Sequence, residues 1–178
     1  MLAIKDALAE TDQEVSWQRF CGFLYLSVEE FMEIQKHLLK EQLGLLAGSA
    51  SGSQRLGWPL PSTVEEFRSA VPLTSYEDYR SMLDGQRGNA LPTPPHLWSQ
   101  TSGRAGTLKW VPYTERAYNT LLDNIMASFI LASANNEGEI NISHGAKVMY
   151  NLAPRPYLTG YVVEGMAQRF QLQSVMPL

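Results

Sequence analysis

Residues 96–114 read HLWSQTSGRAGTLKWVPYT. The stretch predicts two short strands, 96–100 and 108–111, because each is rich in apolar residues and the segment between them contains two glycines. We expect Pro112 to end the second strand, since proline cannot donate a hydrogen bond to a neighbouring strand. The connecting segment either holds a phosphate group or forms a plain turn between strands.

The connecting segment supplies what a phosphate site needs. Phosphate oxygens are negative and accept hydrogen bonds, so their partners are inward-facing backbone N–H groups, hydroxyls and a cation. Glycine allows the backbone conformations with positive φ that turn N–H groups inward. The residues of these kinds are Thr101, Ser102, Gly103, Gly106, Thr107 and Lys109.

The spacing of the glycines excludes two common nucleotide loops. A Walker A loop has four residues between its glycines, whereas two residues separate Gly103 from Gly106. Its lysine also follows a glycine, whereas Leu108 precedes Lys109. No Gly-x-Gly opens a helix, as a dinucleotide-binding fingerprint requires. A turn that uses glycine only for its geometry remains the alternative.

Upstream of the loop, residues 1–90 are predicted to be mainly helical. Three capping boxes predict helix starts in this region: Ser27 with Glu30, Ser62 with Glu65, and Thr74 with Glu77. The first opens a helix over 28–46 with an apolar stripe of Phe31, Ile34, Leu38, Leu39, Leu45 and Leu46. Residues 84–95 are rich in glycine and proline and are predicted to be irregular.

Downstream of the loop, strands and helices alternate over 96–178. Thr114 can cap a helix whose apolar stripe is Tyr118, Leu121, Leu122, Ile125, Met126, Phe129 and Ile130. A buried strand over 147–152, a helix over 159–170 and a strand beginning at 174–178 follow. This order predicts an α/β fold, a helical preface followed by the start of a sheet with flanking helices. Because the chain stops where a core strand should begin, we expect the N-terminal part of a longer protein and an incomplete domain.

The length and the charge of the chain argue against nucleic acid and membranes as its partners. The chain has 178 residues, 44% of them apolar, and a net charge of −4. Because its lysines and arginines are scattered, we expect no binding to nucleic acid or to an anionic membrane surface. The most apolar stretch, 125–134, is shorter than the ~20 residues that a membrane-spanning helix needs. The single cysteine, Cys21, is expected to be a buried structural thiol, and the protein to be cytoplasmic.

The loop and its surroundings resemble a known family. TSGRAGTLK at 101–109 is similar to the phosphate loop of the adenylate-forming superfamily. FRSAVPLTSYEDY at 67–79 and KWVPYT at 109–114 narrow the resemblance to the auxin-responsive promoter family, the plant auxin-amide synthetases and their bacterial relatives. The resemblance covers roughly residues 30–178. Arg104 and Ala105 stand where that family usually has hydroxyl residues, and a guanidinium contact from Arg104 could replace them.

The resemblance implies a two-step ligase. ATP and Mg²⁺ would activate a small carboxylic acid as an acyl-adenylate, and an amino acid or coenzyme A would then accept the acyl group. The residues that would hold the phosphates are Thr101, Ser102, Gly103, Arg104, Ala105, Gly106, Thr107 and Lys109. The resemblance names no catalytic residue within this stretch. Two alternatives stay open: a truncated or degenerate module that packs with a partner and binds no nucleotide, and an acyl-coenzyme A ligase.

A second group of residues, just past the strand at 147–152, is a weaker candidate. Arg155 could pair with the substrate carboxylate, and Tyr157 and Tyr161 could form a wall of the acid pocket. The alternative is that the neighbouring prolines shape a loop and that Arg155 is solvated, and this alternative is favoured because residues beside a strand more often belong to the structure.

Two further types of site are not supported. The three histidines, His37, His96 and His144, share no metal-ligand spacing, so no metal site is predicted. Ser102 lacks the Gly-x-Ser-x-Gly elbow of a hydrolase nucleophile.

Overall fold

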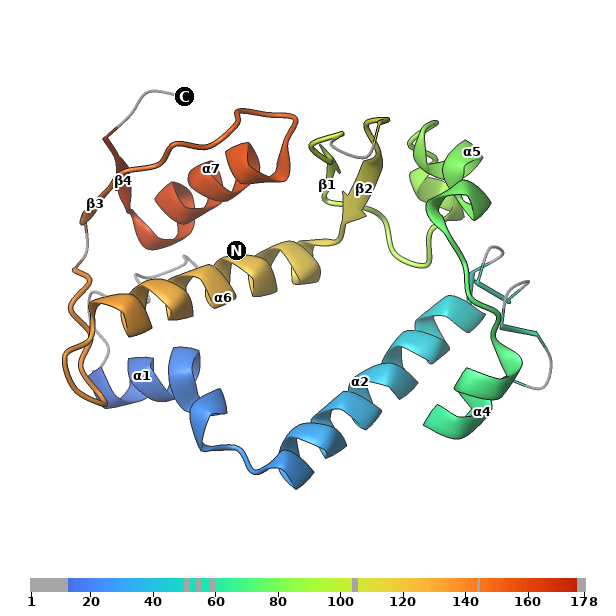
Figure 1. Cartoon of the computed structure of the whole chain (residues 1–178), viewed down its shortest axis with the longest axis horizontal. Helices are drawn as coiled ribbons and strands as arrows, with labels where there is room; N and C mark the ends of the chain where they lie inside the picture. The colour runs from blue at the N-terminus through green and yellow to red at the C-terminus, as the bar shows by residue number, and fades with distance from the viewer. Residues whose placement is uncertain are drawn as a thin grey trace. The chain divides into compact units, whose positions relative to one another are not determined.

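The computed structural model describes residues 13–49, 52–53, 56–57, 60–103, 106–143 and 145–175 (Figure 1). It contains helices and two small two-stranded sheets, β1–β2 and β3–β4. This mixture of helices and small sheets is consistent with the predicted α/β class, and the strands form two separate sheets within the described residues. None of the helices described is long and apolar enough to cross a lipid bilayer.

The chain divides into two compact units that are not continuous in sequence. The first unit contains residues up to 25, residues 99–102 and residues from 116 onward. The second contains residues 26–98 and 103–115. The chain therefore crosses between the units four times, and two of these boundaries fall within β1 and within the loop that follows it.

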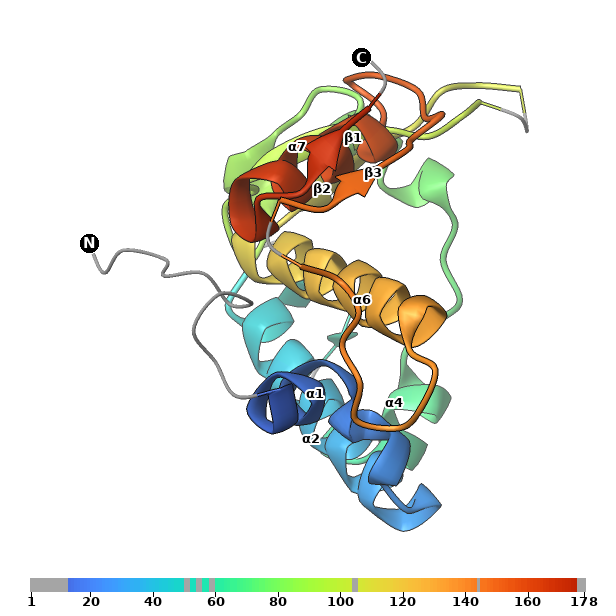
Figure 2. The ribbon, with the colours of Figure 1, turned by 90° about the vertical axis from the view of Figure 1, so that its left-hand side faces the viewer.

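Three helices build the first unit. These are α1 (Gln13–Cys21), which continues into the 3₁₀ turn η1 (Gly22–Tyr25), α6 (Glu115–Ser133) and α7 (Leu158–Phe170). In both views α6 lies between α1 and α7 (Figures 1 and 2). The predicted stripe of α6 supplies the centre of this core: Tyr118, Leu122, Met126 and Ile130 are buried. Phe20 of α1 and Phe170 of α7 meet edge to face, with ring centroids 5.9 Å apart.

Close packing of α7 on α6 depends on a glycine. A Cβ atom built on Gly165 would collide with the Tyr118 hydroxyl and lie 2.7 Å from Cδ1 of Leu122. Arg169, one turn further along α7, donates to the carbonyl of Asn119 at 2.9 Å and to the carboxylate of Asp123 at 2.9 Å. Gly165 and the ion pair between Arg169 and Asp123 thus both hold α7 against α6.

The two strands of the first unit are shorter than predicted. β3 (Lys147–Val148) pairs in parallel with β4 (Gln173–Ser174), in the register that places Lys147 opposite Gln173. The strand predicted over 147–152 therefore ends at Val148, because only these two residues have a partner strand. The strand predicted at 174–178 begins one residue earlier, and residues 176–178 lie outside the described part of the chain.

Helix α2 (Val28–Ala47) of the second unit begins as predicted. The side chain of Ser27 accepts from the Glu30 amide, and the Glu30 carboxylate accepts from the Ser27 amide at 2.8 Å. The expected apolar stripe is only partly covered: Leu38, Leu39 and Leu46 are half-buried, whereas Phe31 is 50% exposed. The buried residue of α2 is Leu43, which lies outside the predicted stripe. Periodicity shows which face of a helix is apolar, and not whether another element covers it.

The other two predicted capping boxes are each displaced by one residue. Helix α4 (Val64–Ala70) starts after Thr63, whose hydroxyl accepts from the Glu66 amide at 3.1 Å, and not after Ser62. The Glu66 carboxylate reaches back to the Ser62 amide at 2.7 Å. Both serine-to-glutamate and threonine-to-glutamate spacings fit the pattern, so the sequence did not separate the two registers.

The third box opens a 3₁₀ turn and not a helix. In η2 (Tyr76–Asp78), Ser75 donates through its amide to Asp78 at 2.7 Å, so the predicted pair of Thr74 and Glu77 is wrong. Glu77 bonds Arg80 instead. The segment continues as the one-turn helix α5 (Arg80–Leu83).

The segment 84–95 is irregular, as predicted, apart from the 3₁₀ turn η3 (Gly88–Ala90). Strands β1 (Leu97–Gln100) and β2 (Trp110–Tyr113) then flank the glycine loop. β2 runs through Pro112, contrary to the prediction that proline would end it. In a two-stranded sheet each strand has one open edge, and a proline there needs no ladder partner.

Candidate phosphate-binding loop

Residues 101–109 connect β1 to β2, as the sequence predicted. The division between the two compact units falls between Ser102 and Gly103. Arg104 and Ala105, the two positions where the chain departs from the resembled loop, lie outside the described residues. The loop is therefore described by residues 101–103 and 106–109.

Both glycines of the loop adopt conformations that favour glycine. Gly103 has φ of +65° and Gly106 has φ of +110°. The Gly106 amide donates to the Gly103 carbonyl at 2.9 Å and closes a turn. A Cβ atom on Gly103 would lie 2.9 Å from Cδ2 of Leu108, whereas the position beside Gly106 is open. This turn is available to a phosphate loop and equally to a plain connection.

The polar side chains of the loop differ in accessibility. Ser102 and Thr107 are exposed, and Thr101 is half-buried. A hydroxyl that faces solvent can donate to an incoming phosphate oxygen without first losing a buried environment. Ser102 and Thr107 are therefore the hydroxyls of this loop that are open to a ligand.

Lys109, at the end of the loop, lies against an aromatic ring. Its Nζ is 5.1 Å from the centroid of the Tyr76 ring, within the range of a cation–π interaction. The hydroxyl of the same tyrosine accepts from the Trp110 amide at 3.1 Å and donates to Oδ1 of Asp84 at 2.6 Å. Sequence reasoning overlooked Tyr76 as a site residue, although it belongs to the quoted segment 67–79.

Charged residues surround the Tyr76 ring. Arg80 donates to Glu77 from Nε at 2.6 Å and from Nη2 at 2.5 Å, and its guanidinium lies 5.6 Å from the Tyr76 centroid. The hydrogen bonds from Arg80 lower the pKa of Glu77, and the charge of Lys109 adds to this effect. Burial, followed by the hydrogen bond to Asp84, raises the pKa of Tyr76. Tyr76 therefore stays a neutral hydroxyl at physiological pH.

The chain carries a family signature that includes this whole arrangement. The model of the GH3 family N-terminal domain matches residues 22–159. The chain belongs to the GH3 family. No curated protein and no solved structure gives a significant match. This family is the auxin-responsive one, it forms acyl-adenylates, and its members are acyl acid amido synthetases.

The GH3 match includes the weaker candidates Arg155 and Tyr157 but ends before Tyr161. Arg155 is 54% exposed, forms an ion pair with Glu164 and stacks over the Tyr161 ring with 4.6 Å between the guanidinium carbon and the centroid. The backbone of Tyr157 forms an isolated bridge to Gln100 of β1. The structure thus brings Arg155 and Tyr161 together, while a carboxylate of the chain itself pairs with Arg155.

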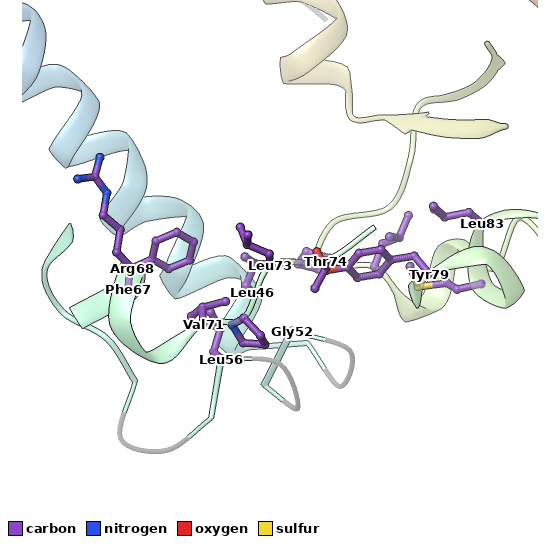
Figure 3. Close-up of a pocket in the computed structure, with 14 residues that line it drawn as sticks. Leu46, Gly52, Leu56, Phe67, Arg68, Val71, Leu73, Thr74, Tyr79 and Leu83 are labelled. Carbon is purple, nitrogen blue, oxygen red and sulfur yellow. The ribbon is translucent and has the colours of Figure 1, made fainter. Parts of the chain in front are cut away.

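The GH3 match also covers an apolar pocket that sequence reasoning did not find (Figure 3). It lies within the second unit and has a volume of about 640 Å³. Leu46, Phe67, Val71, Leu73, Tyr79 and Leu83 are among the residues that line it. The hydroxyl of Tyr79 donates to that of Thr74 at 3.0 Å, so a polar group of the lining is already satisfied.

No metal site accompanies the GH3 loop in the part of the chain that is described. Within it, no three side chains of histidine, cysteine, aspartate or glutamate gather as ligands. His37 and His96 belong to this part, whereas His144 lies outside the described residues. Enzymes of the GH3 family use ATP and Mg²⁺, so the nucleotide's own phosphates are the oxygen ligands to consider for the ion.

Proposed function

We propose that this chain provides the phosphate-holding part of an ATP-dependent ligase that activates a carboxylic acid as an acyl-adenylate. The observation that carries the proposal is the GH3 match over residues 22–159, which spans both the loop and the segment around Tyr76. The glycine conformations, the exposed hydroxyls and the neighbouring lysine support it.

In the first step a carboxylate oxygen of the acid attacks the α-phosphorus of ATP, and the bond from that phosphorus to the bridging oxygen breaks. Pyrophosphate leaves with the negative charge that develops on this oxygen. Lys109 would offset this charge, and Thr101, Ser102 and Thr107 would donate hydrogen bonds to phosphate oxygens. Gly103 and Gly106 would let the backbone approach closely, and Arg104 and the Ala105 amide complete the proposed set. Bound Mg²⁺ would supply further neutralisation of the phosphates.

In the second step an amine nitrogen attacks the acyl carbon of the adenylate and AMP leaves. The amido-synthetase activity of GH3 family members favours an amino acid over coenzyme A as this acceptor. Arg155 and Tyr157 are the proposed contacts to the acid. Arg155 would have to exchange Glu164 for the substrate carboxylate. A cytoplasmic location, where ATP is abundant, is part of the same proposal.

Removal of the lysine tests the proposal directly. Lys109→Ala should weaken Mg·ATP binding by roughly tenfold, the effect expected for one hydrogen bond to a charged group. Isothermal titration calorimetry measures the affinity. Acid-dependent ATP–pyrophosphate exchange measures the activity, with a panel of aryl and alkyl acids and with the substitution made in the complete protein, because we expect the 178-residue chain alone to be inactive. Lys40→Ala is the matched control because Lys40 is an exposed lysine of the same unit. Exchange by Lys109→Ala at the parent rate would show that Lys109 has no such role.

A non-catalytic module that packs with a partner is the second candidate function. Arg104 and Ala105 favour it, because they replace the hydroxyl residues usual in the resembled loop. The same calorimetry separates the two candidates. The ligase requires Mg·ATP binding that depends on Lys109, whereas the module requires that neither the parent chain nor Lys109→Ala binds the nucleotide.

A further inference from the structure

One side chain contacts both the last residue of the glycine loop and the first residue of β2. The ring of Tyr76 lies under the ammonium group of Lys109, and its hydroxyl accepts from the backbone amide of Trp110, the first residue of β2. Tyr76 is 34 positions before Trp110 in the sequence, so this contact ties a distant turn to the loop. All three residues belong to the second unit.

Tyr76 is itself held at both ends. Its hydroxyl donates to the carboxylate of Asp84 at 2.6 Å, a short charge-assisted hydrogen bond. The guanidinium of Arg80 also lies over the Tyr76 ring. Arg80 donates two hydrogen bonds to Glu77, and its Nη1 lies 3.6 Å from Oδ2 of Asp84. The Tyr76 ring is therefore held by Asp84 and Arg80 of its own segment and by the amide of Trp110.

We propose that Tyr76 is a positioning residue for Lys109. Its aromatic ring holds the lysine ammonium, and its hydroxyl, anchored on Asp84, fixes Trp110, the residue of β2 that directly follows Lys109. That the position of Lys109 matters for binding a triphosphate rests on the proposed function. The contact between Tyr76 and Lys109 does not depend on that function. Tyr76 touches no reacting atom and acts only through the lysine.

Two substitutions separate the ring from the hydroxyl. Tyr76→Phe keeps the aromatic face for Lys109 and removes the bonds to Trp110 and Asp84. Tyr76→Leu removes both contacts. Tyr79→Phe is the matched control, since it deletes a tyrosine hydroxyl that bonds Thr74 in the same segment. Circular dichroism and the methyl resonances of the second unit, to which Tyr76 belongs, verify that each variant is folded.

The position of the lysine can be measured without any nucleotide. Aromatic ring currents should shift the ε-methylene protons of Lys109 in the NMR spectrum of the intact chain, with the signal assigned by its loss in Lys109→Ala. The shift should persist in Tyr76→Phe and Tyr79→Phe and vanish in Tyr76→Leu. An unchanged Lys109 signal in folded Tyr76→Leu overturns the proposal.

Mg·ATP titration provides the second readout. Tyr76→Leu should bind about two- to fivefold more weakly than the parent, the factor expected for one exposed cation–π contact, with partial rescue in Tyr76→Phe. Parent-like affinity of Tyr76→Leu, in a chain where Lys109→Ala is impaired, overturns the positioning role while the proposed function stands. A parent chain that binds no Mg·ATP overturns the proposed function, and the Lys109 shift then decides the contact by itself.

Discussion

At the scale of single residues, the glycines of the loop explain why this connection needs its particular sequence. Gly103 and Gly106 have positive φ, which an L-residue adopts only at a cost in free energy. Gly103 also leaves no room for a side chain beside Leu108, whereas Gly106 is limited by its conformation alone. Gly106 is therefore the position at which backbone strain can be tested without a steric clash.

We expect Gly106→Ala to lower the free energy of unfolding by about 1–2 kcal/mol, because alanine is strained at this φ. Urea denaturation measures the loss. Gly138→Ala is the matched control, since Gly138 has φ of +87°, lies outside the loop and likewise has open space around it. Under the proposed function only Gly106→Ala also weakens Mg·ATP binding, and equal affinities for the two variants would contradict a role for this backbone.

The residues of the loop could be predicted from the sequence, but their environment could not. Glycine, hydroxyl and lysine residues are read directly from 101–109, and their backbone conformations follow from chemistry that is local. The contact between Tyr76 and Lys109 depends on how a 3₁₀ turn far upstream packs, and no local pattern specifies it. Resemblance put both segments in one family without showing that they touch.

At the scale of elements, the glycine of α7 determines how closely two helices pack. Gly165→Ala should destabilise the first unit by about 1–3 kcal/mol, since the added methyl group meets Leu122 and the Tyr118 hydroxyl. Gly44→Ala in α2 is the control, because nothing lies within 4 Å of its added Cβ atom. There, alanine should raise stability by about 0.5–1 kcal/mol through its better helix propensity. Thermal unfolding of both variants checks the opposite signs.

The capping box of α2 should make stability depend on pH. Hydrogen bonds from Ser27 lower the pKa of Glu30 below its ordinary value of 4.5. The folded-state pKa is thus the lower one, so the stabilisation is present above pH 4.5 and is lost as the pH falls through the folded value. Glu30→Gln should flatten the decline in stability below pH 4.5, as measured by urea titrations in acid. Glu29→Gln, one residue earlier in the same turn, is the control that removes a carboxylate outside the capping box.

The sequence located the helices better than their ends. Helices α2, α6 and α7 follow apolar periodicity over several turns, and the structure confirms them. Two of the three caps were displaced by one residue because hydroxyl and acidic residues occur side by side at 62–66 and 74–78. Only the backbone geometry selects which hydroxyl accepts the free amide, and that choice depends on packing around the helix start.

At the scale of the whole molecule, residues that are distant in sequence form each core. In the first unit, Met126 of α6 is fully buried, and Phe20 and Phe170, which precede and follow the second unit in the sequence, meet edge to face. The sequence predicted α/β alternation after a helical preface, and the mixture of helices and small sheets in the structure is consistent with an α/β fold. Two discontinuous units and two separate sheets could not be predicted, because long-range contacts decide which strands pair.

We expect Met126→Ala to cost about 2–5 kcal/mol of unfolding free energy, since a buried side chain is replaced by a cavity. Met149→Ala should change stability by less than about 0.5 kcal/mol, because Met149 is 75% exposed. Guanidinium denaturation of the two variants measures the difference. Similar losses for both would mean that the core of the first unit lies elsewhere.

The full burial of Cys21 gives this protein an internal reporter of its own opening. It is the chain's single cysteine, no part of it reaches solvent, and burial raises the pKa of its thiol. An alkylating reagent can therefore reach the sulfur only when α1 separates from its neighbours. The rate of labelling, followed by mass spectrometry in the native buffer, thus reports how often this helix detaches, without a mutation, a dye or a denaturant.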